Sequence, residues 1–108
     1  KPLSLFEVSE LDSPWSRAAP GRFGAHQFQE HMDGTLVYCT WFSGGLRIVD
    51  VADPSAPQEV GHFIPEPAAG KVAPQSNDVD VDRNGLIYLV DRYAGFDILE
   101  FGDGALTR

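Results

Sequence analysis

Short apolar runs alternate with clusters of turn-forming residues along most of the chain, and this pattern predicts antiparallel strands. The first four predicted strands are residues 24–32, 35–43, 46–51 and 58–64, which are separated by Asp33-Gly34, Gly44-Gly45 and the segment 53–57. Asp-Gly and Gly-Gly pairs between β-rich runs are strong hairpin signals, because these residues accept the positive φ of tight turns. No capped apolar run with a 3.6-residue period is present, so we expect no helix beyond a single turn.

A second unit repeats the pattern about fifty residues later. Its predicted strands are NDVDVD, LIYLVDRY and FDILEF, with turns at Asn84-Gly85 and Ala94-Gly95, and residues 102–108 leave little room for a fourth strand. Superposing the two units with one gap pairs Tyr38 with Tyr88, Gly45 with Gly95 and Ile48 with Ile98. An internal repeat of this length built from short antiparallel strands is typical of β-propeller blades.

The predicted fold class is therefore all-β, with about two four-stranded antiparallel β-propeller blades that form part of a larger or assembled propeller. We divide the chain into an N-terminal arm (1–22), a blade (23–64), a linker loop (65–76) and a second, incomplete blade (77–108). Propellers need about four to eight blades to close. The expected partners are therefore further propeller blades or other copies of the chain, and we do not expect an isolated compact monomer.

Residues 44–63, GGLRIVDVADPSAPQEVGHF, resemble the LVIVD-repeat β-propeller family. In that pattern an apolar strand ending in Asp-Val is followed by a D-P-x-x-P turn and a further strand, and the second unit resembles a more divergent copy. The resemblance implies architecture and little chemistry, because function depends on sites grafted onto folds. Asp53 and Pro54 are predicted to be structural, because Asp side chains bond the following amides and Pro fixes φ.

Charge and composition narrow the choice of partners. The formal net charge is -8, from 16 acidic and 8 basic residues, which disfavours nucleic acid and anionic membrane surfaces. No apolar stretch approaches the roughly 18 residues of a membrane span. Cys39 is the only cysteine and lies in an apolar run, so we expect a thiol that packs as a small hydrophobe. A cytoplasmic location is favoured, with a secreted mature form as the alternative.

Two histidines near the first predicted strand raise the question of a metal site. His26 and His31 are five residues apart, so a regular strand would place them on opposite faces, where they cannot chelate one ion together. His26 at the start of an inner strand would face a propeller channel. A distant likeness to the selenium-binding and methanethiol oxidase propellers, in which histidines bind metal, adds to the case for His26. The alternative is that His26 bonds a neighbouring loop.

Carboxylates in the second unit form the other candidate cluster. The segment from Asp80 to Asp91 has the spacing of a calcium loop, but its alternation predicts two strands joined by an Asn-Gly hairpin. Alternation would place Asp78, Asp80 and Asp82 on one strand face, either as a shallow cation site or along the channel. We therefore predict His26, Asp78 and Asp80 as possible ligands of a transition metal or calcium.

The sequence does not identify a reaction. It contains no Ser-His-Asp order, no G-x-S-x-G motif and no glycine-rich phosphate loop. The first hypothesis is a binding or assembly platform. The rival is a metal-dependent enzyme whose site lies in the propeller channel, with His26 as a ligand, Asp78 or Asp80 as a base or supporting group, and the remaining ligands on blades outside this chain.

Overall fold

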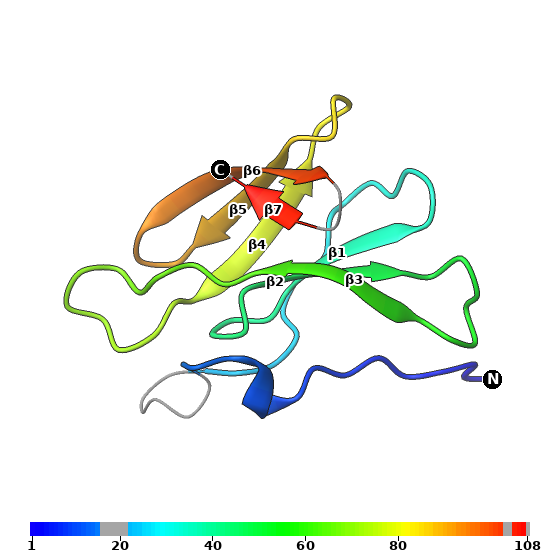
Figure 1. The fold of residues 1–108 in the computed structure, drawn as a ribbon, viewed down its shortest axis with the longest axis horizontal. Coiled ribbons are helices and arrows are strands. Elements are labelled where there is room, and N and C mark those ends of the chain that lie inside the picture. The colour runs from blue at the N-terminus through cyan, green and yellow to red at the C-terminus, as the bar shows by residue number, and fades with distance from the viewer. Residues whose placement is uncertain (16–21, 103–104, 108) are drawn as a thin grey trace.

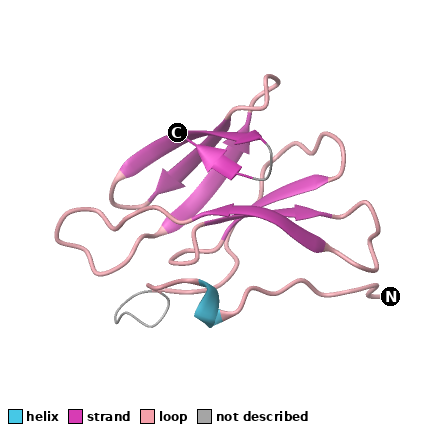
Figure 2. Cartoon of the chain, in the orientation of Figure 1, coloured by secondary structure: helices cyan, strands magenta, loops and turns pink. Residues whose placement is uncertain are grey.

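A computed structural model describes residues 1–15, 22–102 and 105–107, and these fold into two antiparallel sheets (Figures 1 and 2). The first sheet has the order β1-β2-β3 and the second the order β4-β5-β6-β7. The strands are β1 (Leu36–Thr40), β2 (Leu46–Asp50), β3 (Gln58–Phe63), β4 (Ser76–Val81), β5 (Ile87–Asp91), β6 (Gly95–Gly102) and β7 (Ala105–Thr107). Within the described ranges the only helical element is a 3-10 turn, η1 (Glu10–Asp12), which confirms the prediction of an all-β chain.

The turn between β1 and β2 depends on Gly45. Its φ is 75°, and its amide donates to the carbonyl of Phe42 while its own carbonyl accepts from the amide of Trp41. A Cβ at this position would collide with the backbone of Phe63 and Ile64 at the end of β3. Glycine is therefore required here twice, once for the turn conformation and once for the close approach of the neighbouring strand.

The segment between β2 and β3 is held by its own aspartate, as the sequence predicts. One carboxylate oxygen of Asp53 accepts from the Ser55 hydroxyl at 2.7 Å and from the Ser55 amide at 3.0 Å, and the Asp53 carbonyl accepts from Ala56. These two hydrogen bonds from Ser55 lower the pKa of Asp53. The turn redirects the chain into β3, which explains Asp53 and Pro54 without any chemical role.

The predicted strand over residues 24–32 is not regular. It contacts β1 through an isolated bridge between Phe28 and Cys39, and a further isolated bridge joins Phe23 to Phe42 just outside the segment and β1. Gln29 is buried beside β1 and pairs with it through both its backbone and its side chain, since its own amide donates to the Tyr38 carbonyl at 3.2 Å. Its amide oxygen accepts from the Tyr38 amide at 2.9 Å and its amide nitrogen donates to the Leu36 carbonyl at 3.0 Å. Strand alternation therefore does not place His26 and His31 on opposite faces.

The second sheet opens with the predicted hairpin, in which Val81 of β4 pairs with Ile87 of β5. Asp82 follows directly after the last residue of β4, so it belongs to the hairpin turn. Its carboxylate accepts from the amides of Asn84 and Leu86 and from the Tyr88 hydroxyl. Asp82 therefore stabilises the hairpin turn.

The second sheet also has a fourth strand that the sequence left little room for. Three residues suffice, because β7 pairs with the end of β6, with Phe101 opposite Leu106 and Gly102 opposite Ala105. The described part of the chain thus contains three regular strands in the first sheet and four in the second, whereas the sequence predicted four and three.

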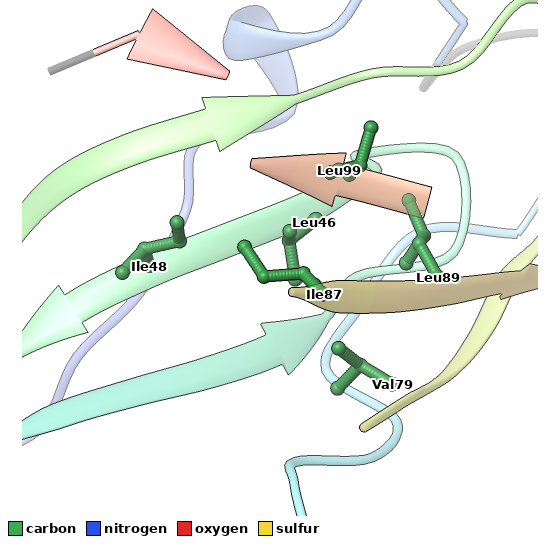
Figure 3. Close-up of a cluster of buried hydrophobic side chains, with 6 residues drawn as sticks. All are labelled: Leu46, Ile48, Val79, Ile87, Leu89 and Leu99. Atoms are coloured by element: carbon green, nitrogen blue, oxygen red, sulfur yellow. The ribbon is translucent and has the colours of Figure 1, made fainter. Parts of the chain in front are cut away.

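The hydrophobic core lies between the two sheets. It consists of six buried side chains, Leu46 and Ile48 from β2, Val79 from β4, Ile87 and Leu89 from β5, and Leu99 from β6 (Figure 3). Partly buried side chains such as Tyr38 and Phe101 pack around them. A backbone clasp adds to this packing, because Phe42 and Ser76 exchange two amide-to-carbonyl hydrogen bonds of 3.1 Å. Phe42 adopts a φ of 48°, so the clasp holds a residue in a conformation that favours glycine.

We predict that Gly45→Ala lowers the free energy of unfolding by roughly 2 kcal/mol or more, because strain at positive φ adds to the collision with β3. Gly34→Ala is the matched control, because Gly34 has a φ of 77° and open space around its Cα. Gly34→Ala should lower the free energy of unfolding only through backbone strain at positive φ, by roughly 1 kcal/mol. Urea denaturation of both variants measures the two changes, and equal losses would contradict the close contact with β3.

Asp82 makes stability depend on pH. Burial raises its pKa, but hydrogen bonds from the Tyr88 hydroxyl and from the amides of Leu86, Asn84 and Gly85 outweigh burial, so the pKa is lowered. A carboxyl group whose pKa is lower in the folded state stabilises the fold above its unfolded pKa of about 3.9, and the stabilisation is lost as pH falls through the folded pKa. Wild-type protein should therefore lose thermal stability below about pH 4.

The variant Asp82→Asn should show a shallower loss of melting temperature than wild type over the same acid range, because it has no carboxylate to protonate. The control is Glu100→Gln on an exposed position of β6, which should keep the wild-type slope. Parallel curves for wild type and Asp82→Asn would show that this carboxylate does not stabilise the hairpin.

Candidate protein-docking faces

The two sheets meet in the core through faces that are not equivalent in the internal repeat. In the first sheet the core face carries Tyr38, Leu46 and Ile48. The internal repeat pairs these positions with Tyr88, Phe96 and Ile98, which lie on the side of the second sheet that points away from the core. The second sheet meets the first through Ile87, Leu89 and Leu99 instead. The contact therefore joins unlike faces and leaves one face of each sheet on the outside.

The outer face of the second sheet is apolar and open, and we define it by Tyr88, Val90, Phe96 and Ile98. Tyr88 pairs with Ile98 and Val90 with Phe96 across β5 and β6, which places all four side chains on one face. Their exposed fractions show the absence of a cover within the described chain: Phe96 is 63% exposed, Ile98 46% and Val90 39%. Contiguous exposed apolar side chains of this kind mark interaction sites.

Carboxylates border this face along β4. Asp80 lies opposite Tyr88 and Asp78 lies opposite Val90 in the strand register. Each carboxylate accepts a hydrogen bond from the amide of the following residue, and both side chains are exposed. The Tyr88 hydroxyl donates to Asp82 at 2.9 Å, and that hydrogen bond raises the pKa of Tyr88. The face thus has an apolar centre on β5 and β6 and an acidic border.

The outer face of the first sheet is also largely apolar, and we define its apolar part by Phe28, Val37, Cys39, Val49 and Val51. Arg47 lies opposite Cys39 on the same face. Val37 pairs with Val49 across β1 and β2, and Phe28 lies opposite Cys39 in the irregular segment beside β1. Burial raises the pKa of the Cys39 thiol, whose sulfur donates to the carbonyl of Thr40, so Cys39 packs among apolar neighbours as predicted. A raised pKa keeps the thiol protonated at neutral pH.

The N-terminal arm covers part of this face and lies on the side of the first sheet away from the second (Figure 1). The Ser4 hydroxyl donates to the carbonyl of Pro54 at 2.7 Å, and the Phe6 ring meets the Trp41 ring edge-on at 5.9 Å. Farther along the arm, Val8 is buried and the Ser13 hydroxyl donates to the buried carbonyl of Ser43 at 2.6 Å.

Two apolar hollows remain on the outer face of the first sheet. One, of about 360 Å³, lies between the arm and the sheet and is lined by Phe6, Cys39 and Val49 among others. The second, of about 330 Å³, lies beyond the arm and is lined by Phe28, Gln29, Glu30, Met32 and Val37. Both volumes are those of pockets that take side chains or small molecules.

Arg47 anchors the arm to the sheet, and we did not identify it from the sequence. Its side chain is only 1% exposed, and it donates to the carbonyls of Gly44 and Asp12 and contacts the Glu59 carboxylate at 3.3 Å. The contact with Asp12 ties η1 to β2, 35 residues apart in the chain. An arginine inside an apolar strand is itself a signal, because a charged residue is buried only when it is paired.

The predicted metal-ligating residues lie near one another along β4 but do not converge. The His26 ring contacts the carbonyl of Asn77, next to Asp78, and packs beside the Phe42 ring at 4.7 Å between centroids. Asp78 and Asp80 line a small polar hollow with Gln27 and Glu30, and His26 is not among its lining residues. In the part of the chain that the structure covers, no three His, Cys, Asp or Glu side chains could hold one metal ion.

Asp91 at the end of β5 is a second buried polar residue, and its hydrogen bonds were not predicted from the sequence. It occupies the twelfth position of the calcium-like segment, but its carboxylate accepts from the amides of Gln75, Tyr93 and Ala94 at 2.8 to 3.1 Å. It therefore fixes the turn between β5 and β6 and the end of the preceding loop.

Among the residues described, no helix is long and apolar enough to cross a membrane.

Comparison with known proteins finds a family match over the first sheet. Residues 32–64 match the model of the LVIVD repeat. The match covers β1, β2, β3 and the turn at Asp53, and it ends before the second sheet. No curated protein and no solved structure gives a significant match to the chain. The first sheet of this chain is therefore similar in sequence to LVIVD repeats, which form β-propeller-like blades.

Proposed function

We propose that the chain acts as a binding or assembly platform whose working surface is the outer face of the second sheet. The observation that carries the proposal is the open apolar row formed by Tyr88, Val90, Phe96 and Ile98, which the repeat matches with side chains buried in the first sheet. Aromatic and aliphatic side chains at the centre of a face, bordered by charged residues, are the usual composition of a protein interface.

The chemistry of this face favours a protein partner over other classes. A net charge of -8 and the Asp78 and Asp80 border disfavour phosphate backbones and anionic lipid surfaces. A flat sheet face with protruding rings fits another sheet better than it fits a small molecule, because small-molecule sites are concave. The uncovered area also favours association, since burying apolar surface stabilises a complex by about 25 cal/mol per Å².

The test is self-association and partner binding of the full chain with one face residue changed. We predict that wild type associates in a concentration-dependent way in light scattering coupled to size exclusion. Ile98→Lys should raise the dissociation constant at least about tenfold, because it places a charge at the centre of an apolar contact.

Val60→Lys is the matched control, because Val60 is an exposed apolar residue on β3 in the other sheet and the charge change is the same. It should leave association unchanged. A wild-type chain that stays a sharp monomer at every concentration, with a cooperative melt, would rule out the open face as an assembly surface. If Val60→Lys weakened association as much as Ile98→Lys, association would not be specific to the outer face of the second sheet.

The metal-dependent alternative rests on one contact. The His26 ring contacts the carbonyl of Asn77, beside Asp78, so a site that used His26 and Asp78 would draw its remaining ligands from blades beyond this chain. We predict under this alternative that purified protein contains copper, iron or zinc at a stoichiometric ratio in elemental analysis and that His26→Ala lowers that ratio. Metal content well below one per chain, unchanged by His26→Ala, would count against it.

A further inference from the structure

We propose that the outer face of the second sheet of one copy packs on the outer face of the first sheet of a second copy, head to tail. The proposal rests on the proposed function and names the partner of the same face. The occupant is a second copy of this chain because the complementary face is present on the molecule itself, on the side opposite to the open one.

The contact between the two sheets inside the molecule is the model for the proposed contact between copies. Inside the molecule, Leu46 and Ile48 of the first sheet pack on Ile87, Leu89 and Leu99 of the second. The repeat equates Leu46 and Ile48 with Phe96 and Ile98, and it equates Val37, Cys39 and Val49 with Ile87, Leu89 and Leu99. The arm covers the side of Cys39 and Val49, so the part of this contact that a second copy can repeat is Phe96 and Ile98 against Val37 and the neighbouring Phe28.

Phe28 provides independent support from the strand pairing. It lies opposite Cys39 as Val79 lies opposite Leu89, so Phe28 is the counterpart of a core residue. Val79 is 4% exposed, whereas Phe28 is 64% exposed. A core position is thus uncovered on the first sheet because no sheet formed by the described residues lies against it, and the head-to-tail contact supplies that sheet.

The shapes of the two faces are also complementary. The outer face of the second sheet presents protruding side chains, whereas the outer face of the first sheet is hollow beside Phe28, Met32 and Val37. The arm covers the neighbouring hollow near Cys39 and Val49, so contact with the second copy begins at the part the arm leaves open. A contact between unlike faces is heterologous and continues from copy to copy, forming a ring or an open chain.

The test is complementation between two full-length variants, each with one face disabled. Ile98→Lys disables the outer face of the second sheet and Phe28→Lys that of the first, and both residues are exposed, so the fold should tolerate the change. We expect each variant alone to associate at least tenfold more weakly than wild type. An equimolar mixture should form heterodimers with nearly the wild-type dissociation constant, because one intact pair of unlike faces remains.

The double variant Phe28→Lys with Ile98→Lys is the control, and it should bind none of the other chains. Phe96→Lys and Met32→Lys provide a second pair if either first variant melts early. Association lost in Ile98→Lys but intact in Phe28→Lys would mean that like faces pair, which overturns the head-to-tail contact and leaves the proposed function standing. Absence of association in wild type would overturn both.

Discussion

The packing of β2 on the β4–β6 face holds the structure together. Leu46 and Ile48 lie fully buried against Ile87, Leu89 and Leu99, and the second sheet is positioned on the first by this contact and by the clasp between Phe42 and Ser76 (Figure 3). Side chains alternate between the two faces of a sheet, and each sheet buries one of its faces in this core. What happens to the other two faces decides what the chain can do.

The two outer faces are treated differently. On the first sheet, the arm lies across the side of Cys39 and Val49 and is fastened by Arg47 and by Ser13. On the second sheet, Phe96 and Ile98 remain exposed within the described chain. The arm therefore acts as a partial substitute for a neighbouring sheet on one side only. This asymmetry, together with the unlike faces that meet in the core, is the physical basis for assigning a docking role to the open side.

Local patterns predicted most of the fold because hairpins are specified by nearby residues. The turns at Gly45 and at Asp82 to Gly85 were visible as a Gly-Gly and an Asn-Gly pair between alternating runs, and the Asp53 turn is stabilised locally by hydrogen bonds from Ser55. The irregular segment beside β1 was not predictable in the same way, because the side chain of Gln29 takes over part of the hydrogen bonding with β1. β7 was missed because three residues carry too little pattern.

The roles of the buried polar residues could not be predicted, because their hydrogen-bond partners are distant in the sequence. Arg47 meets Asp12 and Asp91 meets Gln75, and neither pairing leaves a periodic trace. The aromatic residues beside the turns do not by themselves indicate the candidate faces, because the structure buries Trp41 under the arm and exposes Phe96. Which aromatic residues remain open depends on what covers each sheet, and that is a tertiary property.

Hydroxyl-radical footprinting of the full chain at low and high protein concentration tests the pairing of unlike faces most directly. The account predicts that Tyr88 and Phe96 on the second sheet become protected together with Phe28 and Met32 on the first, while exposed Leu11 on η1 keeps its reactivity. Protection confined to Tyr88 and Phe96, or no change at any of these side chains, would contradict it.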